Sequence, residues 1–154
     1  MKVIKNVNFP SYVFSSFVAG YVMMAVDMIM DGFLGLFGTY REYLQMVRQF
    51  GIFQGFEGIA LVVGHTINSL VLALFFVDVR VYNRIPLRGG LAKGIFFGAV
   101  WHVWVLVFLL FASIGGSKFA ISMLHSPYTS HISLFLLHLI WGGTLGLLYT
   151  PKEL

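Results

Sequence analysis

The clearest structural signal in the chain is GIFFGAVWHVWVLVFLLFASIGGS, residues 94–117, in which no Asp, Glu, Lys or Arg occurs. Three similar charge-free runs cover residues 6–26, 58–77 and 119–151. A helix needs about 20 apolar residues to cross the roughly 30 Å hydrocarbon core of a bilayer. We therefore expect four transmembrane helices, near residues 11–35, 54–77, 93–114 and 127–149.

Composition indicates the same class of protein. Of 154 residues, 58% are hydrophobic and 10% are charged, and the mean hydropathy is +0.86, whereas soluble domains carry roughly 25% charged residues. This excludes a disordered chain, a collagen and an ordinary soluble enzyme. Because the chain has no cysteine, disulfides, zinc–thiolate sites and iron–sulfur clusters are excluded too. No linker divides residues 1–154, so we expect a single integral membrane domain.

The basic residues predict the orientation. Four spans place both termini on one side of the membrane, together with most of the Lys and Arg residues: Lys2, Lys5, Arg80, Arg84, Arg88, Lys93 and Lys152, against Arg41, Arg48 and Lys118 opposite. Basic residues favour the cytoplasmic side. We therefore expect a cell (inner) membrane protein with cytoplasmic N- and C-termini. The first run is too long for a signal peptide, and the dispersed charge of +4 predicts no binding to nucleic acid.

The segment between the first two spans predicts a short helix near residues 39–50. Residues 39–42 match a capping box, in which Thr39 caps the helix and Glu42 reaches back to free amides. Apolar residues then recur at helical spacing, which is typical of an amphipathic helix in the membrane interface. Ser126 and Pro127 predict a cap and a first-turn proline for the last span. The full prediction is an all-α, polytopic membrane protein with four transmembrane helices in a bundle and one interfacial helix.

Three histidines lie near the middle of three different spans. At 1.5 Å per residue, His65 and His138 are each about 16 Å from the outer end of their spans, and His102 is about 13 Å from the inner end of its span. Two facing imidazoles can bind haem iron, and three can bind copper or zinc. A b-type haem held by His65 and His138 would require small residues around its porphyrin: Gly64, Gly98 and Gly142. The alternative is that these histidines only form hydrogen bonds between helices.

The glycines of the last two spans have a simpler interpretation as well. Gly94 and Gly98, and likewise Gly142 and Gly146, are spaced as small-xxx-small steps. Such steps let the backbones of membrane helices approach closely. The same residues therefore predict either tight helix packing or a groove for a planar cofactor.

A second group of polar residues lies nearer the outer side. Asp27 and Asp31 are one turn apart in the first span, Glu57 begins the second, and His131 lies near the start of the fourth. Carboxylates together with a histidine can bind a metal ion or pass protons. The alternative is that these side chains lie in the aqueous interface or pair with basic residues such as Arg41.

The last span carries a resemblance to a known group of proteins. HLIWGGTLGLLY, residues 138–149, resembles the H-x-x-[YW]-G-x-x-x-G-x-x-Y ending of small four-helix prokaryotic membrane proteins that are loosely related to YagU-type inner-membrane proteins. Gly64 with His65, and residues 88–90 with Gly94 and Gly98, fit the same pattern. The resemblance implies a four-helix membrane protein and no established reaction.

Three functions remain open at this stage. Small size and short loops favour a non-catalytic accessory subunit of a larger membrane complex, such as a respiratory one. The central histidines favour a haem- or metal-binding electron-transfer subunit, and the acidic residues favour a small transporter or proton conduit. The 26 aromatic residues, more than a thin interior readily buries, predict contact with other membrane subunits or self-association.

Overall fold

The computed structural model describes residues 7–152. Every regular element in this range is a helix, which confirms the all-α prediction. Lys2 and Lys5, which contribute to the orientation argument, lie outside the described residues. Four helices are long and apolar enough to cross a membrane: Phe9–Phe33, Glu57–Val77, Gly90–Ile114 and Tyr128–Leu148.

The elements follow one another with short connections. They are α1 (Phe9–Asp27), the π-helical turn η1 (Met28–Phe33), α2 (Thr39–Gln49), α3 (Glu57–Val77), α4 (Val79–Arg84), α5 (Gly90–Ile114), α6 (Lys118–Leu124) and α7 (Tyr128–Leu148). The first long helix consists of α1 and η1 together. The four predicted spans agree with the long helices to within a few residues, whereas the short helices α4 and α6 were not predicted.

The predicted capping box is wrong. Gly38, with a φ of 98°, is the N-cap of α2, and Thr39 is already helical. The Thr39 hydroxyl donates to the Ser130 carbonyl at 3.4 Å, and Glu42 accepts from the Ser130 hydroxyl at 3.0 Å. Both side chains of the expected cap therefore join α2 to α7, because these tertiary partners compete with the local amides.

The start of α7 also differs from the prediction. Pro127 is the N-cap rather than a residue of the first turn, and no side chain caps the helix. The Ser126 hydroxyl donates to the Ser122 carbonyl at 3.2 Å and accepts no hydrogen bond from the first amides of α7. Side-chain caps occur instead at α1, α4 and α6, where the acceptors are Asn8, Asp78 and Ser117.

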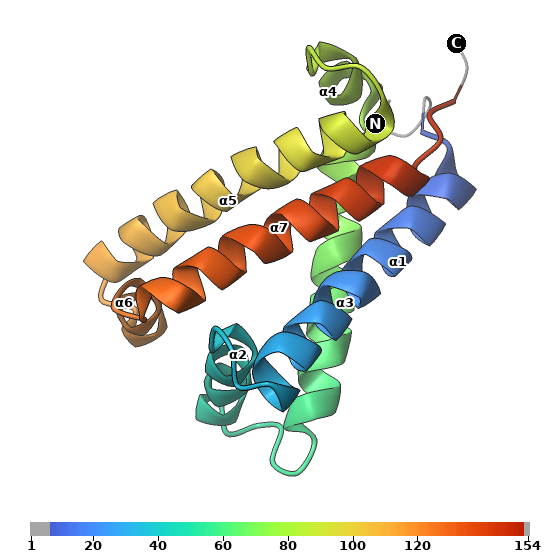
Figure 1. Cartoon of the computed structure of the whole chain (residues 1–154). Coiled ribbons are helices and arrows are strands. Elements are labelled where there is room, and N and C mark those ends of the chain that lie inside the picture. Colours follow the sequence, from blue (N-terminus) through green and yellow to red (C-terminus); the bar gives the residue numbers. More distant parts are fainter. Residues whose placement is uncertain (1–6, 153–154) are drawn as a thin grey trace.

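The long helices fall into a group of three and one that crosses it. α7 lies between α1 and α5, and Figure 1 shows these three helices side by side. α3 crosses behind them and packs mainly against α1. At the end away from α2, the Asn8 side chain donates to the Thr150 carbonyl at 3.0 Å, and the Thr150 amide donates to the Ser11 hydroxyl at 2.8 Å. Both ends of the described chain therefore lie on the same side of the protein.

Glycines bring the backbones of α5 and α7 into contact. Gly94 and Gly98 on α5 face Gly142 and Gly146 on α7, and a Cβ added at any of the four would overlap a backbone carbonyl of the other helix. Small residues allow this approach because no side chain separates the two backbones. The prediction of tight packing is confirmed.

Many large apolar side chains on the long helices face outward. On α5, the exposed side chains of Trp104, Phe108 and Phe111 recur at helical spacing and share one face. In water this much apolar surface would drive aggregation, whereas lipid tails solvate it. The structure is therefore consistent with an integral membrane protein whose helices contact the lipid bilayer.

Aromatic packing holds α4 at the end where the described termini meet. The rings of Phe76, Tyr82 and Tyr149 lie edge to face, with centroids 5.3 Å apart for Phe76 and Tyr82 and 5.8 Å apart for Tyr82 and Tyr149. The Lys93 ammonium lies over the Tyr82 ring and donates to the Tyr82 carbonyl at 2.7 Å. Burial raises the pKa of Tyr82 above its usual value, so the phenol stays neutral.

Candidate functional site

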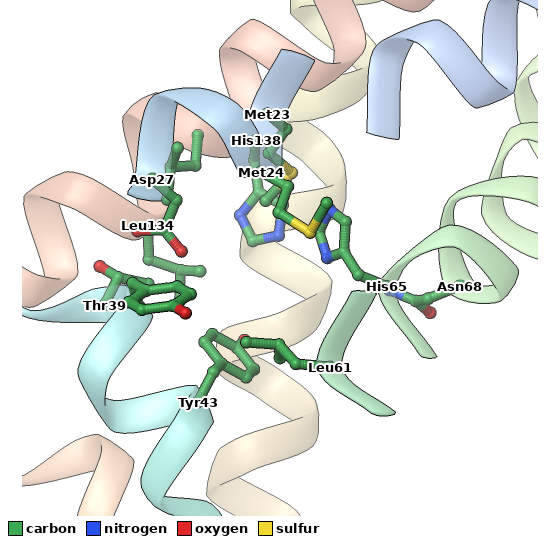
Figure 2. Close-up of a pocket in the computed structure, with 12 residues that line it drawn as sticks. Met23, Met24, Asp27, Thr39, Tyr43, Leu61, His65, Asn68, Leu134 and His138 are labelled. Atoms are coloured by element: carbon green, nitrogen blue, oxygen red, sulfur yellow. The ribbon is translucent and has the colours of Figure 1, made fainter. Parts of the chain in front are cut away.

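A polar cavity of about 90 Å³ lies between α1, α2, α3 and α7. Figure 2 shows Asp27, His65, His138 and Tyr43 pointing toward it, each from a different helix. The other lining residues are Met23, Met24, Thr39, Tyr40, Leu61, Asn68, Leu134 and Leu137. A cavity of this size has room for a few water molecules or one small ion.

Two polar atoms on the wall of this cavity are unusual. Asp27 Oδ1 and His65 Nε2 are fully buried, and neither has a hydrogen-bond partner among residues 7–152. Most buried polar atoms in proteins are paired, and leaving one unpaired costs about 1–3 kcal/mol. Asp27 and His65 line one cavity, and each carries a buried polar atom without a partner among the described residues, which makes this cavity the candidate site for a proton or a small polar ligand.

A hydrogen-bonded pair of histidines lies beside the cavity. His102 Nδ1 on α5 and His138 Nδ1 on α7 are 3.1 Å apart, and both side chains are buried. One ring must donate and the other accept at this contact, so the two rings share one hydrogen. The pair therefore connects the wall of the cavity, through His138, to the neighbouring helix α5.

The wall supplied by α2 carries a phenol that stays protonated. Burial, with the Asp27 and Glu42 carboxylates nearby, raises the pKa of Tyr43 to about 12. Glu42 accepts from Ser130 through one oxygen, and its other oxygen is buried without a partner among the described residues. Tyr43 can therefore donate a hydrogen bond to an anion or to water in the cavity, but it cannot act as a base at neutral pH.

The interior is closed on the side of the cavity away from α2. A second cavity of about 20 Å³, also lined by His65 and His138, has room for roughly one water molecule. Beyond it, Trp141 Nε1 donates to the Ser69 hydroxyl at 2.8 Å, and that hydroxyl donates to the Ser16 carbonyl at 2.7 Å. These bonds satisfy the buried polar groups and leave no open path on this side.

The predicted outer cluster does not gather as one group. Asp31 is 1% exposed and accepts from the backbone amide of Arg41 at 2.7 Å and from its guanidinium at 2.6 Å. Glu57 and His131 do not line the cavity that Asp27 faces. Within residues 7–152, no three His, Asp or Glu side chains lie close enough to hold a metal ion. Pairing with Arg41 therefore accounts for Asp31, and only Asp27 of this set reaches the cavity.

The structure does not provide the space that a haem between the histidines needs. At Gly98 and Gly142, which we expected to make room for a porphyrin, the backbone of the opposite helix fills the gap. Of the three glycines expected around the porphyrin, only Gly64 has open space where a Cβ would lie. His138 bonds directly to His102, and a cavity of about 90 Å³ cannot enclose a macrocycle.

Sequence reasoning missed the contribution of α2 to the site. Thr39, Tyr40 and Tyr43 line the cavity, although this segment was expected only to lie in the membrane interface. The available signal was Tyr43, since an aromatic residue on the apolar face of a short helix needs a surface to pack against. Met23 and Met24 of α1 also line the cavity.

The described residues form an all-helical protein with four helices long and apolar enough to span a membrane and a cavity lined by Asp27, His65 and His138. No family model matches the chain, and no curated protein and no solved structure matches it.

Proposed function

We propose that the chain is a small proton conduit, without catalytic activity of its own, in which protons enter the cavity and bind at Asp27. One observation carries the proposal: Asp27 and His65 line the same cavity, and Asp27 Oδ1 and His65 Nε2 are buried without protein partners among the described residues. Carboxylates and imidazoles are the groups that relay protons within membranes, and their cost in lipid makes a purely structural role expensive.

The histidine pair supplies the next step of the proposed path. An imidazole can accept a proton at one ring nitrogen and release one from the other. A proton bound at Asp27 can therefore pass to His65 or His138 and then, across the 3.1 Å contact, to His102. Passage to the far side requires an opening movement near Ser69 and Trp141, because hydrogen bonds close the interior there.

The proposed arrangement in the membrane is a bundle of the four long helices, with α2 in the outer interface and both termini in the cytoplasm. The asymmetry of the basic residues supports this orientation. Those at the end where the described termini meet are Arg80, Arg84, Arg88, Lys93 and Lys152, and those at the α2 end are Arg41, Arg48 and Lys118. Basic residues favour the cytoplasmic face, so the inner membrane of a cell is the expected location.

Proton flux into vesicles tests the proposal. The purified full chain is reconstituted with a trapped pH-sensitive dye, and the outside is acidified. We expect the parent protein to acidify the lumen faster than protein-free vesicles, and Asp27→Asn to remove this difference. Glu57→Gln is the matched control and should conduct like the parent, because Glu57 does not line the cavity. Equal flux in Asp27→Asn and the parent would refute the proposal.

An accessory role in a larger membrane complex, such as a respiratory one, is the second candidate. The observation that favours it is the row of exposed aromatic side chains on α5, of which Phe108 is 71% exposed. Aromatic residues are enriched at protein interfaces. Affinity purification from native membranes in mild detergent should recover a partner at fixed ratio, and Phe108→Ala should weaken that recovery. A chain that always purifies alone would exclude this role. The YagU-type resemblance of residues 138–149 agrees with either candidate and stays a prediction.

A further inference from the structure

An apolar groove lies between α3, α4 and α5, and two of its lining residues, Phe97 and Trp101, also pack against the buried core. It has a volume of about 330 Å³ and is lined by Phe75, Val81, Phe97, Val100, Trp101 and Trp104. This volume falls at the lower end of the roughly 300–1,000 Å³ that small-molecule sites occupy. Almost all of the lining is hydrocarbon or aromatic ring, so the groove suits an apolar chain.

The groove begins at the basic end of the protein. Val81 belongs to α4, and the α5 residues of the groove lie roughly 10–21 Å along that helix from Gly90. The groove therefore extends from the membrane surface toward the middle of the bilayer. This is the path that an acyl chain follows from its headgroup.

The charges at this end are predominantly positive. Arg80, Arg84, Arg88 and Lys93 lie within residues 78–93, and Asp78 is the single acidic residue there. Asp78 already has an ion-pair partner, because its carboxylate accepts two hydrogen bonds from the Arg80 guanidinium at 2.9 and 3.1 Å. Arg84 is exposed and forms no ion pair with another described residue.

Arg84 is well placed relative to the groove. It lies three residues after Val81 on α4, and residues at this spacing share a helix face. The aromatic contacts of Tyr82 with Phe76 and Tyr149 fix α4 against the ends of α3 and α7. Arg84 therefore lies one helical turn from a residue that lines the groove, and a basic residue beside an apolar groove between membrane helices is an arrangement that binds anionic lipid headgroups.

We propose that this groove binds an anionic phospholipid of the bilayer, with one acyl chain against Trp104 and Val100 and the phosphate at Arg84. The site is independent of the polar cavity and of proton conduction. Charge complementarity favours an anionic occupant, because the ammonium of a zwitterionic headgroup offsets its phosphate and an apolar helix of a second copy carries no charge for the arginine to pair with.

Lipid binding to the purified full chain in mild detergent tests this site. Native mass spectrometry measures the apparent affinity for phosphatidylglycerol and for phosphatidylcholine. We expect phosphatidylglycerol to bind more tightly, and Arg84→Gln to weaken its binding roughly fivefold while the binding of phosphatidylcholine falls less. Arg48→Gln, which removes an exposed arginine at the opposite end, is the matched control and should bind like the parent.

The groove itself is tested by Val100→Trp, which fills it and should weaken binding of both lipids. Trp104→Ala removes an exposed wall of the groove and should also weaken the binding of both lipids. It serves as the second test of the groove if Val100→Trp does not fold. Equal binding of the two lipids by the parent would overturn the proposal, and so would equal losses in Arg84→Gln and Arg48→Gln. A dimer that Val100→Trp dissociates without any change in lipid binding would instead assign the groove to a second copy.

Discussion

Asp27 and Asp31 are four residues apart and have different surroundings. Asp31 is bonded to the amide and guanidinium of Arg41, whereas Asp27 faces the cavity with an unpaired oxygen. In an α-helix, residues four apart share a face. The π-helical turn at Met28–Phe33 changes the register of the backbone between them, as such turns do. One carboxylate therefore has a fixed ion-pair partner, and the other is available to a proton.

Gly142 is the residue at which the contact of α5 with α7 can be tested. Gly142→Ala places a methyl group against the Gly94 carbonyl, and overpacking of this kind costs roughly 1–3 kcal/mol. Gly64→Ala is the matched control, because no described atom lies near a Cβ there. Denaturation in mixed detergent micelles should show a lower midpoint for Gly142→Ala and an unchanged or higher one for Gly64→Ala. If both variants unfold like the parent, the backbones are not in contact.

At the scale of the element, α2 is the wall of the cavity that polar bonds tie to η1 and α7, through Asp31 with Arg41 and through Ser130 with Thr39 and Glu42. Asp31→Ala removes both acceptors used by Arg41, whose side chain is 62% exposed and stays hydrated when the bond is lost. We expect α2 to detach more often, with hydrogen exchange of its amides faster by roughly tenfold. Asp78→Ala, which removes the surface pair with Arg80, should leave exchange in α2 unchanged. Unaltered exchange in Asp31→Ala would show that other contacts hold α2.

The elements also show what sequence patterns can and cannot predict. The four long helices follow from charge-free runs, because lipid leaves a spanning segment no other way to satisfy its backbone. The capping box at Thr39 failed because Ser130, far away in sequence, supplied the partners of both side chains. α4 and α6 were missed because helices of six or seven residues are too short to establish a periodic pattern.

At the scale of the whole molecule, the site depends on how each long helix is rotated about its own axis when the helices pack. The sequence of a single helix does not determine this rotation. Spacing along each helix correctly brought His65, His102 and His138 to a similar depth. Which of them touch depends on how the helices pack: α5 and α7 meet closely at Gly94 and Gly142, and His102 contacts His138, which leaves no space for a macrocycle between these two helices. The contribution of α2 depends on the same packing, so Tyr43 could not be assigned to the cavity beforehand.

The orientation of the whole molecule is testable with single cysteines, because the natural chain has none. Lys118→Cys and Lys152→Cys place one thiol at each end of the protein. A membrane-impermeant maleimide added to intact cells with a permeabilised outer layer should label Lys118→Cys and not Lys152→Cys, since basic residues favour the cytoplasmic side. After lysis, both variants should react. Labelling of Lys152→Cys in intact cells would reverse the proposed orientation.

The most direct test of proton conduction is the reversal potential of the current across a planar bilayer that contains the purified protein. A pH difference is imposed with equal salt on both sides. A proton-selective path through Asp27 and the histidines predicts a reversal potential that moves by about 59 mV per pH unit, and a current that is absent in Asp27→Asn. A reversal potential that stays at zero, or no current above that of the bare bilayer, would contradict the account.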